Sequence, residues 1–271
     1  MGLFDRVTRQ SSPRRRPKGG TSSRDAYVPP VPPRAPGDEP PSPADALAAA
    51  GVAPPRPLVW VGTAASGSAV WSSPVANGAG QRLWAELREG SDATRTWPVL
   101  CGSTPVPASW GLDRSRHPDE VDIPDAGPLL EVSPASRRTP EEGFRTRLEP
   151  TEHAVVEADL ASGYLALVTS VQGWQLPVAV GFDGVGGWTS AEHAAVLLRW
   201  QQRYRAELVS LTDSGVGVRV GRPPTSHEAA MLAARDIYAY CPDVVDRGLG
   251  SMWALATTMA VSSAWSLRWA A

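Results

Sequence analysis

The apolar positions in the first half of the chain predict short strands and short helices. Leu58–Thr63 and Trp97–Cys101 are brief apolar runs, which are typical of strands buried in a sheet. Asp45–Ala50 predicts a short helix, and Gln81–Glu89 predicts a second one because its apolar residues recur at helical spacing. Residues 102–150 have no sustained period, so they predict a long irregular loop.

The second half of the chain has clearer strand patterns. Gly163–Ser170 and Trp174–Phe182 are apolar runs with three residues between them, so they predict two strands joined by a short turn. Glu207–Thr212 and Gly215–Val220 predict a hairpin around the intervening Asp213-Ser214 turn.

Two helix starts are predicted from capping boxes. Thr189 is followed three residues later by Glu192, and Thr225 is followed in the same way by Glu228. The second of these helices is expected to end at Cys241-Pro242, because proline does not continue a helix. A final apolar helix and an edge strand are expected at about Ser251–Val261 and Ala264–Trp269.

These elements favour an α+β fold, with a mixed, partly antiparallel sheet packed with two or three helices. We expect three parts in the chain: a disordered tail over 1–43, a smaller α/β segment over 44–151 that includes the loop 102–150, and an α+β domain over 152–271. The chain has eleven Trp residues against three Phe, and we expect most of the Trp residues to fill the core.

Charge and proline content set the tail apart from the rest of the chain. Residues 1–24 have a net charge of +6, although the whole chain has 26 basic and 28 acidic residues. Thirteen of the 27 prolines fall within residues 1–57, and this composition is typical of a disordered, partly polyproline segment. Two interpretations remain open: a solvated leader, or a basic segment that makes weak contact with anionic surfaces such as membranes and, nonspecifically, nucleic acid.

Composition also narrows the class of protein. Two Cys residues exclude a disulfide-dense secreted scaffold and a four-thiolate zinc site. No apolar run is long enough for a membrane-spanning helix, and the tail has no apolar core of a signal peptide, so we expect a cytoplasmic protein. Arginine in place of lysine, with abundant Ala, Gly and Pro, is typical of a high-GC bacterium.

Several segments of the second half resemble a family. They are GGWTS at Gly186–Ser190, LLRWQQRYRAELVSL at Leu197–Leu211, RPP at Arg222–Pro224, EAAMLAARDIYAYCPDVVDRG at Glu228–Gly248 and WSLRW at Trp265–Trp269. In order and spacing they resemble a bacterial family known only as domain of unknown function 4253, over about Trp174–Trp269. The family tends to have Asn, Gly and Asp where this chain has Thr189, Arg205 and Ala270. Because that family has no established activity, the resemblance implies a domain and no mechanism.

The glycine-rich loop 181–188 is the first candidate site, because free backbone N–H groups before a helix can hold an anion. The loop matches neither of the phosphate-binding patterns G-x-x-x-x-G-K-[ST] and G-x-G-x-x-G. The simpler interpretation of its glycines is that they form tight turns and let Trp188 pack closely. The residues that we expect to bind a ligand or a protein partner lie in or next to this loop and around the predicted helix end at Cys241-Pro242: Asp183, Gly186, Gly187, Trp188, Thr189, Tyr240 and Asp243.

No catalytic constellation, metal site or cofactor motif is evident in the sequence. Cys241 follows the end of a predicted helix, where the helix dipole raises a thiol pKa, so a buried structural thiol is expected. His227-Glu228 lacks the second His of a zinc-protease motif. We therefore predict a non-enzymatic binding or interaction module with no sequence-specific nucleic-acid binding. The alternative is a hydrolytic enzyme that uses Asp183 and Asp243 near the glycine loop.

Overall fold

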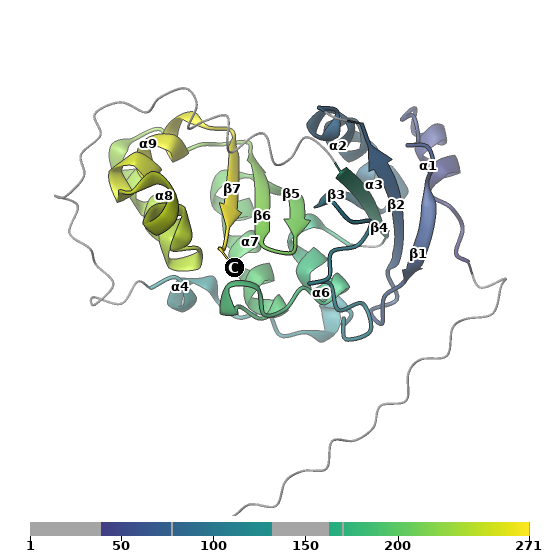
Figure 1. Ribbon diagram of the computed structural model, residues 1–271, viewed down its shortest axis with the longest axis horizontal. Helices are drawn as coiled ribbons and strands as arrows, with labels where there is room; N and C mark the ends of the chain where they lie inside the picture. The colour runs from purple at the N-terminus through teal and green to yellow at the C-terminus, as the bar shows by residue number, and fades with distance from the viewer. Residues whose placement is uncertain (1–38, 77, 132–162, 170, 271) are drawn as a thin grey trace, which may run out of the picture. The chain divides into compact units, whose positions relative to one another are not determined.

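The computed structural model describes residues 39–76, 78–131, 163–169 and 171–270. The predicted tail 1–43 therefore lies almost wholly outside the described residues, as do residues 132–150 of the predicted loop 102–150 and the start of the predicted domain 152–271. Within the described ranges, seven strands form one mixed sheet in the order β1-β2-β4-β3-β5-β6-β7. Figure 1 shows β5, β6 and β7 side by side, with β1 near the opposite edge. The α+β fold expected from the sequence is confirmed.

The elements of the first half confirm most of the short predicted segments. They are α1 (Ala44–Ala49), β1 (Val59–Thr63), β2 (Ala69–Val75), α2 (Gly80–Glu89), α3 (Ser91–Thr94), β3 (Thr96–Gly102), the 3₁₀ turn η1 (Pro118–Glu120) and α4 (Ala126–Leu129). The sequence patterns did not predict β2, which is buried at every position except Pro74. Its run Ala69–Val75 contains two serines, and Ser72 and Ser73 are both buried within the sheet.

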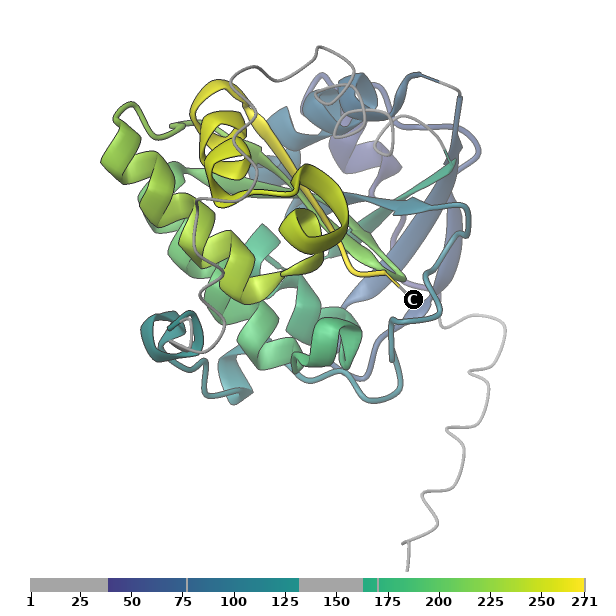
Figure 2. The ribbon, with the colours of Figure 1, turned by 60° about the vertical axis from the view of Figure 1, so that its left-hand side comes forward.

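The second half has more regular helices. Its elements are β4 (Gly163–Thr169), η3 (Gly173–Gln175), α6 (Leu176–Val180), η4 (Val185–Gly187), α7 (Ser190–Tyr204), β5 (Ala206–Thr212), β6 (Gly215–Val220), α8 (His227–Tyr240), η5 (Val244–Leu249), α9 (Met252–Val261) and β7 (Ala264–Arg268). The predicted hairpin is the antiparallel pair β5–β6, and β7 is the last strand of the sheet. Figure 2 shows α8 and α9 lying side by side.

The prediction of a strand over Trp174–Phe182 is wrong. The structure has a 3₁₀ turn there, followed by the helix α6, in which all five residues are buried. Periodicity does not separate a buried helix from a buried strand in such a short apolar run. Pro177 fits the first turn of a helix, where its missing N–H costs nothing, and Gly181 ends α6 in the left-handed conformation.

The capping boxes are confirmed in one case and shifted in the other. The Thr189 hydroxyl accepts a hydrogen bond from the Glu192 backbone N–H, and a Glu192 carboxylate oxygen accepts one from the Thr189 N–H at 2.8 Å. In α8 the cap is Ser226, whose hydroxyl accepts from the Ala229 N–H at 3.2 Å, and not Thr225. Serine and threonine are both good caps, so the sequence alone placed this start one residue too early.

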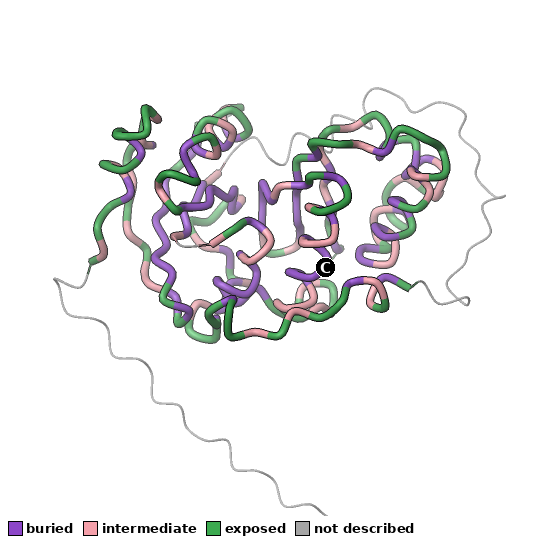
Figure 3. Tube along the Cα trace, turned by 180° about the vertical axis from the view of Figure 1, so that it is seen from behind, coloured by how far each residue is buried: buried purple, intermediate pink, exposed green. Residues whose placement is uncertain are grey.

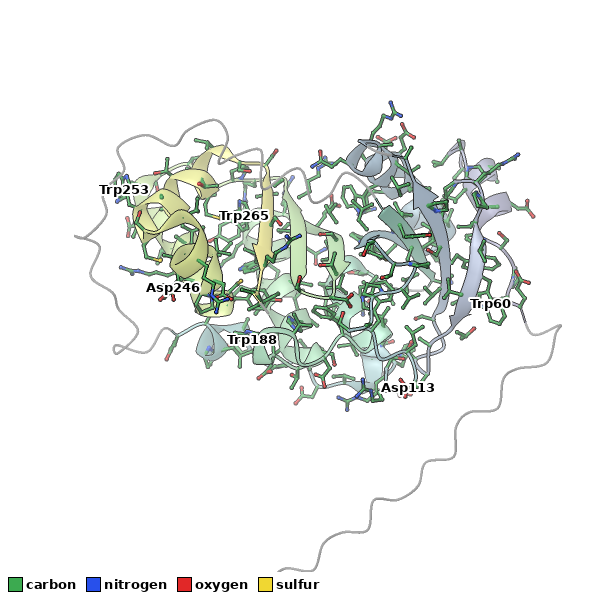
Figure 4. The ribbon with its side chains drawn as sticks, viewed as in Figure 1. Trp60, Asp113, Trp188, Asp246, Trp253 and Trp265 are labelled. Carbon is green, nitrogen blue, oxygen red and sulfur yellow. The ribbon has the colours of Figure 1, made fainter. Side chains whose placement is uncertain are left out.

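The two faces of the sheet are covered differently. On one face, Trp200 and Tyr204 of α7 pack with their rings against Trp265 of β7, which is labelled in Figure 4. Since successive strand residues alternate between faces, Arg219 points to the opposite face, where its guanidinium lies over the Trp84 ring of α2. Figure 3 shows buried residues along the central strands, whereas β1 has no buried residue.

Candidate functional site

A pocket of about 460 Å³ lies where the parallel strands β3 and β5 end. Ligands of open sheets with parallel strands commonly bind outside the carboxyl ends of those strands, so this is a favourable place for a site. The residues that form its walls come from β3, β5 and its turn, and β7: Gly102, Ser103, Ser210, Thr212, Asp213, Ser266 and Arg268.

The floor of the pocket is formed by β6, in which glycine and valine alternate between the two faces of the sheet. Val216 and Val218 pair with Leu267 and Trp265, and these four side chains share the face that α7 covers. Gly215 and Gly217 of β6 therefore occupy the positions whose side chains would point to the other face, so β6 contributes only backbone there. Each glycine has a polar residue beside it on both neighbouring strands: Ser210, Thr212, Ser266 and Arg268. We call this strip, with Gly215 and Gly217 between four polar residues, the glycine trough; of the two glycines, Gly215 lines the pocket.

Ser210 is the buried polar group of the trough. The residue is 5% exposed and lines the pocket. Its hydroxyl forms no hydrogen bond with any residue that the structure describes, whereas the neighbouring Thr212 hydroxyl donates to the Gly215 carbonyl at 3.3 Å. Because the rest of the residue is buried, this hydroxyl is open only toward the pocket, where a bound molecule can form a hydrogen bond with it.

The pocket also contains one acidic and one basic side chain. A carboxylate oxygen of Asp213 accepts a hydrogen bond from the Ser109 backbone N–H at 2.8 Å, which fixes the acid beside the pocket. Arg268 is the strand partner of Gly215, and the next N–H along β7, that of Trp269, donates to the Ser214 carbonyl at 2.8 Å. Both charges thus lie at the end of the trough that is closed by the β5–β6 turn. Burial strongly raises the pKa of Cys101, so its thiol is a neutral wall group.

The predicted glycine loop lies elsewhere, before α7. Gly186 has φ of 65°, and a Cβ atom on it would collide with the indole ring of Trp269. Asp183 is exposed, and its carboxylate accepts a hydrogen bond from the Ser190 N–H at 2.9 Å in the first turn of α7. Gly187 and Thr189 are also exposed. The loop therefore combines close packing with an acidic residue at a helix N-terminus.

Trp188 and Tyr240 are in contact in the structure. The Trp188 indole N–H donates to the Tyr240 carbonyl at 3.0 Å, and the two ring centroids are 5.2 Å apart. Trp188 is half-buried and is labelled in Figure 4, but Tyr240 is fully buried. Tyr240 is thus a core residue, and its ring offers no surface to a docking partner.

His193 lies beneath this loop, in contact with Tyr240. The Tyr240 hydroxyl lies 2.5 Å from the Nδ1 atom of His193, and His193 has no exposed surface. Burial lowers the pKa of His193 from 6.5 to about 3, and the Val185 backbone opposes this shift only in part. The ring is therefore neutral at pH 7, and it is unsuited to act as a base at the surface.

The buried imidazole predicts a loss of stability in acid. The pKa of His193 is lower in the folded state than in the unfolded state. The contribution of the neutral ring to the free energy of unfolding is therefore fully present above about pH 6.5, and it is lost as the pH falls toward 3. At pH 5 we expect His193 to lower the free energy of unfolding by about 2 kcal/mol. Urea titrations of the wild type and His193→Gln at pH 7 and pH 5 measure this, with the half-exposed His117→Gln as the control. An equal loss in the wild type and His193→Gln would contradict the assignment.

Asp243 does not cap the turn that follows it. One carboxylate oxygen accepts from the Ala270 N–H at 2.8 Å, and the other lies 3.5 Å from the Arg247 guanidinium. It therefore ties the end of β7 to the start of η5. Among the described residues there is no group of three or more His, Cys, Asp and Glu side chains that could hold a metal ion. Within the same ranges, no helix combines the length and apolar character needed to cross a membrane.

Comparison with known proteins identifies the C-terminal part of the chain. Residues 164–270 match the model of a family described as a domain of unknown function, DUF4253, so the resemblance inferred from the sequence is confirmed. No curated protein and no solved structure matches the chain. Arg205 has φ of 50° at the end of α7, which is a left-handed conformation that glycine adopts readily.

Sequence reasoning missed the residues of the glycine trough. Its signal is the run GVGVRV at 215–220, in which glycine alternates with valine on the two faces of one strand. The sequence shows this alternation, but it does not show which polar residues of β5 and β7 lie beside the glycines. That information comes only from the strand register.

Proposed function

We propose that this protein is a binding module that holds a small polar molecule in the glycine trough. The observation that carries the proposal is the Ser210 hydroxyl, which belongs to a residue that is 5% exposed, opens into the pocket and has no hydrogen-bond partner among the described residues. The pocket volume of about 460 Å³ lies within the range of small-molecule sites.

The arrangement of the acids supports binding more than hydrolysis. Asp183 and Asp243 each accept a hydrogen bond from a backbone N–H, and Asp243 also pairs with Arg247. His193, which is near the same loop, is buried and neutral. These groups hold the loop, α7 and the end of β7 in place, so we assign them a structural role.

The proposal includes a location in the cytoplasm of a bacterium. Its support is that both cysteines, Cys101 and Cys241, are unpaired and buried, which suits a reducing compartment, together with the arginine-rich composition. The loop Asp183–Thr189 remains our prediction for a surface that contacts a protein partner. The basic tail remains a prediction for weak contact with anionic surfaces.

Replacing Ser210 by Val should weaken ligand binding about tenfold, because it removes one buried hydrogen bond and adds a methyl group to the pocket. The purified full-length protein is incubated with a bacterial metabolite extract, and the retained small molecules are identified by mass spectrometry. The control is Thr257→Val, which removes an exposed hydroxyl from α9. The proposal fails if no small molecule is retained, or if the same molecules are retained equally by Ser210→Val and the wild type.

A further inference from the structure

The two charged residues of the glycine trough lie at the same end. Asp213 belongs to the β5–β6 turn, and Arg268 faces Gly215, two residues after Asp213, across the β6–β7 pair. Paired residues of antiparallel strands are about 5 Å apart at Cα. An anionic and a cationic side chain therefore border the same part of one cavity.

The Asp213 carboxylate has more acceptor positions than its described contact uses, and Arg268, which has a contact of its own, presents several N–H donors. Asp213 uses one carboxylate oxygen for the Ser109 N–H, and a carboxylate offers about four acceptor positions over its two oxygens. Arginine presents five N–H donors, which suits a carboxylate on one side of the guanidinium while other contacts continue elsewhere. A ligand with one positive and one negative group would complement both side chains.

The remaining walls narrow the class of ligand. The described residues that line the pocket include no aromatic ring, so they provide no stacking surface for a sugar ring or a nucleobase. Arg268 is the basic group among those residues, and a single cation beside an acid is a poor match for a phosphate dianion. Hydroxyl groups of Ser210 and Ser266 are suited to hydrogen bonds with a further polar group.

We infer that the glycine trough binds a small zwitterion, an amino acid or a short peptide, with its carboxylate at Arg268 and its ammonium group at Asp213. This inference rests on the proposed function and specifies its ligand. The peptide bonds or polar side chain of the ligand would then lie over Gly215, within reach of the Ser210 hydroxyl.

The test uses the full-length protein and a defined set of probes in isothermal titration calorimetry. The probes are the twenty free amino acids, dialanine, N-acetylated and amidated forms of each compound that binds, glucose and inorganic phosphate. We expect at least one zwitterion to bind, and its acetylated and amidated forms to bind at least tenfold more weakly. Asp213→Asn and Arg268→Gln should each weaken it at least tenfold, whereas the exposed Arg82→Gln should not.

The outcomes separate this inference from the proposed function. Binding of glucose or phosphate that is weakened by Ser210→Val, without binding of a zwitterion, overturns the inference and leaves the proposed function standing. Equal binding of a zwitterion and its acetylated or amidated form also overturns the inference. If none of the probes binds, the inference is contradicted, while retention of another metabolite that depends on Ser210 would still support the pocket.

Discussion

Replacing Trp200 by Ala should lower the free energy of unfolding by about 3–5 kcal/mol, because it opens a large cavity in the core. Trp200 is fully buried, and its ring makes edge-on contacts with Tyr240 and Trp265, at centroid distances of 5.2 Å and 6.1 Å. The substitution removes one of the side chains through which α7 packs against α8 and β7. Urea denaturation monitored by circular dichroism measures the change.

The matched control is Val261→Ala at the end of α9, where the side chain is 66% exposed. A surface substitution of this kind should change stability by no more than about 0.5 kcal/mol. A loss below about 1 kcal/mol for Trp200→Ala would show that the aromatic cluster does not form the core.

Replacing Gly181 by Ala should lower the free energy of unfolding by about 2–4 kcal/mol. Gly181 has φ of 67°, and a Cβ atom there would collide with the carbonyl oxygen of Gly111, whose own N–H donates to the Gly181 carbonyl at 3.0 Å. The left-handed conformation costs alanine about 1 kcal/mol, and forced displacement of packed backbone typically adds about 1–3 kcal/mol.

Gly184→Ala separates these two contributions. Gly184 has φ of 83°, but a Cβ atom on it would have no atom within 4 Å. Gly184→Ala should therefore lower the free energy of unfolding only by the cost of the left-handed conformation, about 1 kcal/mol. Thermal or urea denaturation of both variants gives the comparison, and equal losses would refute the proposed collision with Gly111.

Local signals explain how much of the fold could be predicted. A cap such as Thr189 acts on residues three positions away, so sequence spacing alone located the start of α7. The hairpin β5–β6 is also local, because its turn residues separate two apolar runs. In contrast, β2 includes the buried Ser72 and Ser73, and nothing in its local pattern shows that neighbouring strands enclose it.

The site was harder to predict than the fold, because its residues meet only through long-range pairing. Ser210 lies on β5 and Ser266 on β7, and Gly217 of β6 lies between them. The glycine loop was predicted as a site because Gly184, Gly186 and Gly187 lie within four residues of one another in the sequence. Gly186 there accommodates the Trp269 ring, which is a packing requirement that the sequence does not distinguish from ligand binding.

The position of β4 in the sheet has a consequence for the family. β4 carries the start of the matched region at Tyr164, yet both strands that flank it, β2 and β3, come from the part of the chain before the match. A copy of the matched region alone would leave both hydrogen-bonding edges of β4 unsatisfied. In this chain, the region that matches the family therefore depends on two flanking strands from outside it, and one of them, β3, also contributes a wall of the pocket.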